Sequence, residues 1–203
     1  MGNGNKAEML IAVCAVMTSV IALFVAWDQG RVMRAQQHGA VYPVIQMDGF
    51  VSTSVDRASL GIRISNSGVG PAIIESVRML KDGKAVEGLS TYRDQLPANY
   101  DLSWAGLTGR ALAPGDEITP IDISWKREDI TSAQLAAVAE EWGGLVMEIC
   151  YCSVFDRCWR ARDLGTARAE RVPRCERGTT DIFEELRTAP RLPEPEMPEG
   201  DTP

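Results

Sequence analysis

The sequence is poor in the residues that carry out acid–base and nucleophilic catalysis. It contains one histidine, His38, which is remote in the chain from any candidate nucleophile, and such catalysis needs the base within hydrogen-bond reach of the nucleophile. No Lys-Ser or Lys-Thr follows Gly68 and Gly70, so these glycines are not a phosphate loop. Two acidic residues such as Asp101 and Asp116 could act as a catalytic pair only if they lay together, and nothing in the sequence places them so. We therefore expect no enzyme, no catalytic residue and no cofactor.

The chain also lacks an excess of positive charge. Its 21 Lys and Arg against 28 Asp and Glu give a net charge of -7, whereas binding to nucleic acid needs a basic surface. We expect no nucleic-acid partner. The 45% apolar and 24% charged content is that of a folded protein, and 203 residues allow one ordinary domain with an anchor and a tail.

Charge, proline and glycine are all absent from residues 9–27, which read MLIAVCAVMTSVIALFVAW. At about 1.5 Å per residue this run is long enough to cross a hydrocarbon core of roughly 30 Å. A cleaved signal peptide would need small residues at alternate positions before the cut, and Val25, Ala26 and Trp27 do not supply them. The run predicts a retained transmembrane signal anchor.

Small residues recur within this run at spacings of three and four, on one face of a helix: Ala12, Ala15, Ser19, Ala22 and Ala26. Such faces let two helices approach closely in lipid. The pattern predicts a seam for a homodimer or for another membrane protein. The alternative is that alanine is simply common in such helices.

Four cysteines lie close together late in the chain: Cys150, Cys152, Cys158 and Cys175. An even number in a dense cluster is typical of disulfides in an exported domain. Cys150 and Cys152 share one face of a strand by its period of two, so each should bond elsewhere. We predict bonds from Cys152 to Cys158 and from Cys150 to Cys175. The alternatives are buried thiols or a zinc site, which the missing paired CxxC motifs disfavour.

Alternation and turn residues predict a mainly β domain. Expected elements are strands at 41–47 and around 60–64, a turn at Asp82-Gly83, a strand at 117–125, a helix at 131–144 and a hairpin of 145–154 with 158–162. Short strands separated by turns favour an antiparallel sandwich with one inserted helix over a parallel sheet.

The stretches LGIRISNSGVGPAIIESVRMLKDGK, LAPGDEI and ICYCSVFDRCW carry a resemblance. They are similar to a family of small bacterial single-span membrane proteins with an immunoglobulin-like extracytoplasmic domain. The similarity covers most of residues 9–165. It implies an immunoglobulin-like sandwich and a topology, and it supplies no catalytic residues.

Two further stretches have a distinct character. Residues 89–109 predict a long loop with three aromatic side chains, Tyr92, Tyr100 and Trp104, which either bind a partner or ligand or cap the end of the sandwich. A basic run either contacts lipid headgroups or an acidic partner, or is a solvated face. Its members are Arg157, Arg160, Arg162, Arg168, Arg171, Arg174 and Arg177.

These observations predict five segments: an N-terminal tail (1–8), the span (9–27), a stalk (28–40), the β domain (41–165) and a largely disordered tail that is basic, then acidic and proline-rich (166–203). The Lys and Arg that flank the span are nearly balanced, with a slight lean toward a cytoplasmic C-terminal side because of Arg31 and Arg34. The cysteine cluster outweighs this lean. We predict a non-catalytic interaction or assembly protein of the bacterial inner membrane, with a periplasmic domain. The alternative is a module that binds a small ligand or glycan through the aromatic loop.

Overall fold

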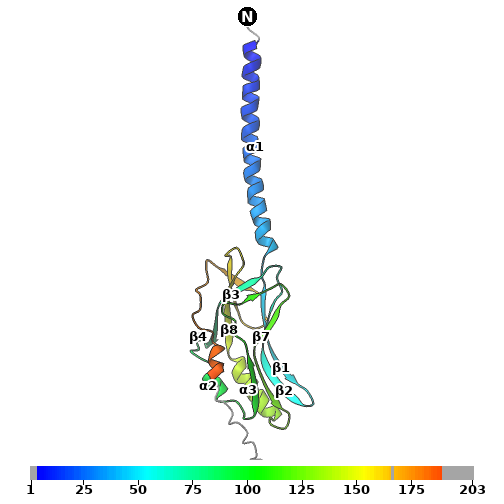
Figure 1. The fold of residues 1–203 in the computed structure, drawn as a ribbon, viewed down its shortest axis with the longest axis vertical. Coiled ribbons are helices and arrows are strands. Elements are labelled where there is room, and N and C mark those ends of the chain that lie inside the picture. Colours follow the sequence, from blue (N-terminus) through cyan, green and yellow to red (C-terminus); the bar gives the residue numbers. More distant parts are fainter. Residues whose placement is uncertain (1–3, 166, 189–203) are drawn as a thin grey trace, which may run out of the picture. The chain divides into compact units, whose positions relative to one another are not determined.

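The structure, a computed structural model, describes residues 4–165 and 167–188. Its contacts divide the chain into two compact units, Met1–Tyr42 and Pro43–Pro203. The first unit contains one helix. The second contains all the described strands (Figure 1).

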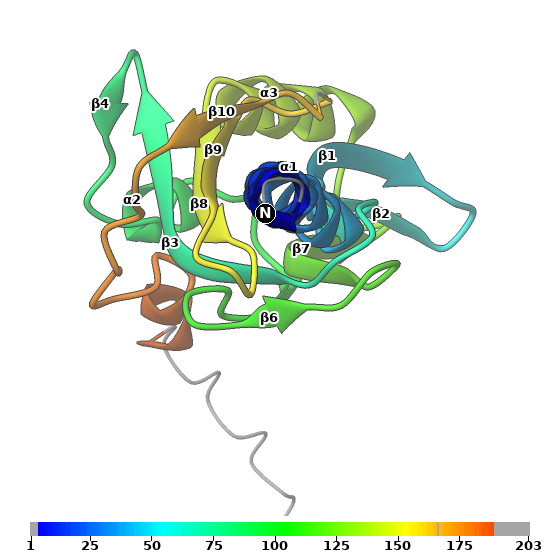
Figure 2. The same cartoon turned by 90° about the horizontal axis from the view of Figure 1, so that it is seen from above.

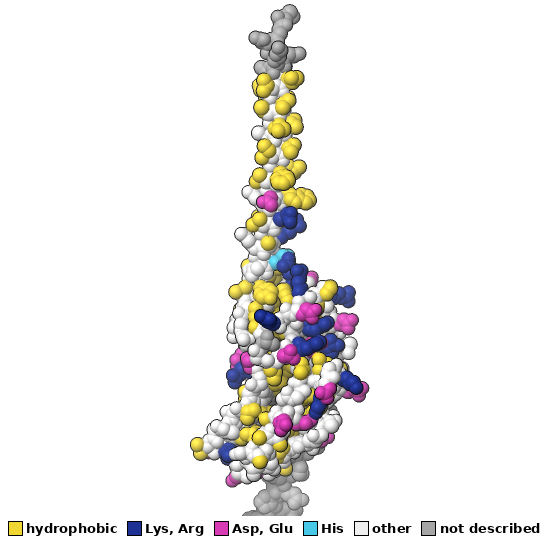
Figure 3. All heavy atoms as spheres, turned by 180° about the vertical axis from the view of Figure 1, so that it is seen from behind, with side chains coloured by type: hydrophobic (Ala, Val, Ile, Leu, Met, Phe, Trp, Pro, Cys, Tyr) yellow, Lys and Arg dark blue, Asp and Glu magenta, His cyan; other side chains and the backbone are white. Residues whose placement is uncertain are grey.

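A single helix, α1 (Gly4–Ala40), joins the predicted span and stalk without a break. From Glu8 it is long and apolar enough to cross a membrane. Every side chain from Glu8 to Trp27 is exposed, and Figure 3 shows apolar side chains along the visible face of this part. Such a surface is unfavourable in water and favourable in lipid, which fits a single-pass membrane protein.

Two antiparallel sheets form the second unit. The first has the strand order β1 (Ile45–Thr53), β2 (Arg57–Asn66), β7 (Glu117–Lys126) and β5 (Tyr100–Trp104). The second has the order β10 (Ala169–Val172), β9 (Cys158–Arg162), β8 (Val146–Cys152), β3 (Ala72–Lys81) and β4 (Lys84–Ala85), and β6 (Ala111–Leu112) also pairs with β3. The helical segments are α2 (Ser90–Arg93), α3 (Ser132–Gly143) and the 3-10 turn η1 (Glu184–Thr188). The predicted mainly β, antiparallel architecture is confirmed.

The two sheets share one hydrophobic core. Every second side chain of β2 is buried, as the alternation predicts: Ala58, Leu60, Ile62 and Ile64. Met79 of β3 and Ile149 of β8 belong to the same core. Trp125 of β7 is fully buried, and its indole N–H donates to the carbonyl of Pro97 at 3.1 Å. A buried ring with its one polar atom satisfied strengthens the core.

Asn66 fixes the junction between the two sheets. Its side chain is fully buried. Its Oδ1 accepts from the N–H groups of Val44 and Gly68, and its Nδ2 donates to the carbonyls of Gly70 and Leu112. All four hydrogen-bonding positions of the amide are therefore used. The NSGVGP stretch turns the chain from one sheet to the other around this one side chain.

Two local signals read from the sequence are confirmed. Asp82 and Gly83, with φ of 51° and 75°, form the tight turn between β3 and β4. Thr131 caps α3, where its hydroxyl accepts from the N–H of Gln134 and the Gln134 side chain accepts from the N–H of Thr131. The helix ends at Gly143, with Gly144 as its C-cap.

Two boundaries predicted in the first half of the domain are wrong. The first strand is β1, which begins at Ile45 and runs to Thr53 rather than over 41–47. Its outer half is exposed except for the half-buried Phe50, so it lacks the alternation that marks a strand. The predicted loop at 89–109 contains α2 and β5, and β5 pairs with β7 as an edge strand.

The predicted end of the domain at residue 165 is also wrong. β10 pairs with β9, and beyond it Phe183 and Leu186 are buried in the main core. The tail is therefore part of the domain as far as residue 188, because long-range contacts order a segment whose own sequence has no regular pattern. The expectation of disorder from Ala189 onward lies outside the described residues.

Candidate interaction surfaces

The predicted seam lies on α1, and its five residues are exposed: Ala12, Ala15, Ser19, Ala22 and Ala26. The Ser19 hydroxyl donates to the carbonyl of Ala15 at 2.7 Å. It is therefore satisfied inside the helix, as a hydroxyl in lipid must be. Contact of this face with a second helix stays a prediction.

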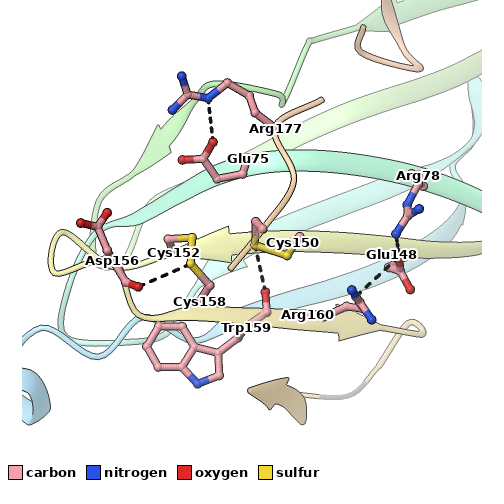
Figure 4. The surroundings of a disulfide bond; sticks show 11 residues. Glu75, Arg78, Glu148, Cys150, Cys152, Asp156, Cys158, Trp159, Arg160 and Arg177 are labelled. Atoms are coloured by element: carbon pink, nitrogen blue, oxygen red, sulfur yellow. Dashed lines mark hydrogen bonds and ion pairs between the residues drawn. A yellow bond between two sulfur atoms is a disulfide. The ribbon is translucent and has the colours of Figure 1, made fainter. Parts of the chain in front are cut away.

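The late cysteines form two disulfides, with the predicted pairing (Figure 4). Cys152 lies directly opposite Cys158 in the β8–β9 hairpin, and their Cα atoms are 4.0 Å apart. Cys150 lies two residues earlier on the same face of β8 and bonds to Cys175, with Cα atoms 5.7 Å apart. The second bond fastens the C-terminal segment, residues 173–188, to the sheet. The Sγ atoms of Cys152, Cys158 and Cys175 lie within 4.8 Å of one another, but a metal would need thiolates, which form only on reduction.

A buried carboxylate, Glu148, lies on the same face of β8 as the two cysteines. In register it stands between Arg78 of β3 and Arg162 of β9. Arg78 donates to its Oε1 at 2.6 Å, Arg162 donates to its Oε2, and Arg160 Nε lies 3.8 Å from Oε1. Burial alone would raise the pKa of Glu148, but the hydrogen bonds and charges of Arg162 and Arg78 outweigh burial and lower it. The carboxylate is held ionised and paired, so it is not a free base.

Sequence reasoning missed this cluster, although a signal was present. Glu148 precedes Cys150 and Cys152 at the same period of two, and Arg160 and Arg162 follow Cys158 at that period. The pattern places the glutamate, the two arginines and the three cysteines on one face of the β8–β9 hairpin. Three members of the basic run are thus paired inside the domain: Arg160 and Arg162 with Glu148, and Arg177 with Glu75 at 3.0 Å. Contact of the run with lipid stays a prediction.

The C-terminal segment crosses this face of the second sheet and leaves a polar cavity of about 640 Å³ beneath it. Its charged lining residues are balanced in number: Arg78, Arg160, Arg174 and Arg177 against Glu87, Glu176, Asp181 and Glu185. Asp181 accepts from the N–H groups of Leu107, Thr108 and Phe183. This carboxylate pins the segment to the loop after β5. The balanced charge gives the cavity no preference for a ligand of one sign.

The three aromatic residues predicted for a partner or ligand do not lie together. Tyr92 on α2 packs edge-on against Trp142 of α3, with ring centroids 6.1 Å apart. Tyr100 and Trp104 share one face of β5, and Tyr100 packs against Trp125 at 6.3 Å. All three side chains are partly buried against the core. Their packing favours the capping interpretation, and glycan binding stays a prediction.

The acidic residues considered for catalysis also lie apart. Asp101 is paired with Arg57 on the first sheet, and Asp116 accepts from the N–H of Ala113 in a turn. His38 belongs to α1, in the other unit. Asp101 and Asp116 therefore bind different partners and not each other. No family model matches the chain, and no curated protein matches its sequence.

Proposed function

We propose that this protein is a membrane-anchored, non-catalytic interaction module of the bacterial cell envelope. Residues 9–27 act as an uncleaved signal anchor in the inner membrane. The β domain, a sandwich of the immunoglobulin-like type, lies in the periplasm and binds another envelope protein. The small-residue seam of the span offers a second contact, to a like helix or another membrane helix.

The observation that carries this proposal is the combination of an uncharged span with two disulfides in one chain. The bonds Cys150–Cys175 and Cys152–Cys158 need an oxidising compartment to persist. A chain that enters the membrane through an N-terminal apolar helix reaches such a compartment when its C-terminal side is exported. The paired state of Glu148 agrees with a binding rather than a catalytic role, since a catalytic acid or base needs a proton that it can exchange with substrate.

The orientation is tested by reporter fusions after Pro203. Alkaline phosphatase fused there should be active, and a cytoplasmic fluorescent protein fused there should stay dark. A matched test uses the cysteines themselves in a Cys14→Ser background. When thiols are trapped in intact cells, the four remaining cysteines should react with a maleimide reagent only after reduction. A bright fusion together with four reactive thiols would overturn the proposal.

Binding is tested by cleavable crosslinking in native membranes. The full-length chain should be trapped with a specific second protein in stoichiometric yield. If the contact is largely apolar, the yield should be the same at higher ionic strength, because salt screens only interactions between charges. Failure to trap either a partner or a second copy would remove the interaction role.

A further inference from the structure

The outer edge of β1 is open over its second half. Ser67 N–H donates to the carbonyl of Val44, and Ser54 N–H donates to the carbonyl of Arg57. The N–H and C=O groups of even-numbered β1 residues are therefore hydrogen-bonded to β2. Those of odd-numbered residues point outward from the edge. The outward carbonyl of Met47 already accepts from the N–H of another segment at 2.7 Å.

That segment is the turn after β9, through Gly165, and it covers the edge only at its start. Beyond it, no backbone hydrogen bond among the described residues reaches Gly49, Val51 or Thr53. Three N–H and three C=O groups thus face outward from the β1–β2 hairpin, which Figure 2 shows reaching beyond the neighbouring strands. An open edge of this kind is a template for another strand.

An apolar groove of about 220 Å³ adjoins this edge. Val51 of β1, Leu60 and Ile62 of β2, Trp142 of α3 and Leu164 of the turn after β9 line it, and every other lining residue is apolar or glycine. Binding pockets for whole small molecules commonly measure about 300 to 1,000 Å³. This groove is smaller, and its size and lining suit one large apolar side chain.

Charge around the groove is mostly of one sign. Glu140 of α3 and Asp163 of the turn after β9 adjoin lining residues, and both are acidic. Glu141 is paired with Lys81. The alternation of β1, β2 and β7 turns Asp48, Arg63 and Asp122 to the other face of the sheet. Arg63 is itself paired with Glu117 at 3.0 Å. A basic residue on the partner would therefore find complementary charge at this rim.

We propose that the β1 edge and this groove bind a short extended segment of another protein. The segment adds as a strand to Gly49, Val51 and Thr53, places one Leu, Met or Phe side chain in the groove, and carries Lys or Arg beside that anchor. Strand addition obtains affinity from main-chain hydrogen bonds and specificity from side-chain pockets. The segment continues the pairing that Gly165 begins at Met47.

A second copy of this chain fits the edge less well. Pairing β1 with β1 across a twofold axis would bring two acidic rims together, and like charges on neighbouring strands are destabilising. The proposal rests on the proposed function and names the chemistry of its partner.

Two variants separate the groove from the edge. Gly143 lines the groove, and a Cβ added there would meet no atom within 4 Å, so Gly143→Leu should fill the groove without strain. Val51→Pro should remove one outward N–H and no β1–β2 hydrogen bond. Ala136→Leu, on an exposed position of the same helix, is the matched control.

The probe is an array of nine-residue peptides rich in Val and Thr. Their central residue is Leu, Met, Phe, Ser or Asp, and their flanking residues are Lys or Glu. Labelled full-length protein in detergent micelles should bind the Lys-flanked peptides with an apolar centre. Gly143→Leu and Val51→Pro should each weaken binding at least tenfold, while Ala136→Leu should not change it. Melting curves confirm that each variant is folded.

The proposal fails if no peptide binds, if the central residue or flanking charge has no effect, or if Gly143→Leu binds as the wild type does. Crosslinking of the wild type and Gly143→Leu in native membranes separates this failure from that of the proposed function. A partner trapped equally by both would keep the interaction role and reject this surface. A concentration-dependent dimer abolished by Val51→Pro would also overturn it, in favour of self-pairing.

Discussion

Replacement of Asn66 should lower the free energy of unfolding of the domain by a large amount for so small a side chain. Asn66→Ala removes four hydrogen bonds of 2.8 to 3.1 Å and leaves two N–H and two C=O groups without their partner at a buried position. At about 1 kcal/mol for each bond, the free energy of unfolding should fall by about 4 kcal/mol. That is a large share of the ~5–15 kcal/mol typical of a domain.

The assay is thermal unfolding of the full-length protein in detergent, followed by near-UV circular dichroism. For a unit of this length, 1 kcal/mol corresponds to about 2–4 °C, so Tm should fall by about 8–16 °C. Asn66→Asp should be no milder, since it turns an acceptor toward the carbonyls of Gly70 and Leu112. Asn99→Gly is the control: it loses one exposed hydrogen bond to Asp129 and suits the positive φ of 61°. A fall of less than about 3 °C in Asn66→Ala would refute the reasoning, because it would mean that water replaces the amide at little cost.

Three further variants test other parts of the domain by the same unfolding assay. Replacing Cys150 and Cys175 together by Ser opens a loop with a sequence separation of 25, and by loop entropy this should lower the free energy of unfolding by about 3.5 kcal/mol. Because the pKa of Glu148 lies below its ordinary 4.5, its ionised form stabilises the fold at neutral pH. That contribution should fade as the pH falls below about 4.5 toward the folded pKa, so the gap between wild type and Glu148→Gln should narrow there. Gly61→Ala should lower stability by about 1–3 kcal/mol, since its Cβ would lie 2.4 Å from the carbonyl oxygen of Ile121.

A different result would contradict each of these three predictions. Equal stability with and without the Cys150–Cys175 bond would show that the C-terminal segment is held by packing alone. A gap between wild type and Glu148→Gln that stays constant down to pH 3 would show that the arginines do not lower the pKa of this carboxyl group. A wild-type melting curve for Gly61→Ala would mean that β2 and β7 can separate at this point without loss.

The sequence by itself determined the features that depend on neighbouring residues. The missing charge of residues 9–27 specifies a helix that is apolar enough to cross a membrane, because any charged side chain there would be costly in lipid. The positive φ at Asp82-Gly83 and the cap at Thr131 follow from local backbone chemistry. The period of two in β8 placed Cys150 and Cys152 on one face and so restricted their bonds.

Only the tertiary structure decided which segments meet. Phe183 is buried because the Asp181 carboxylate accepts hydrogen bonds from the backbone of Leu107 and Thr108, more than seventy residues earlier in the chain. No local sequence pattern predicts that contact. The ionised state of Glu148 depends likewise on arginines from two other strands. The open edge of β1 is of the same kind. Whether a strand lies at an edge depends on which strands pair, and pairing is set by long-range burial that a run of residues does not record.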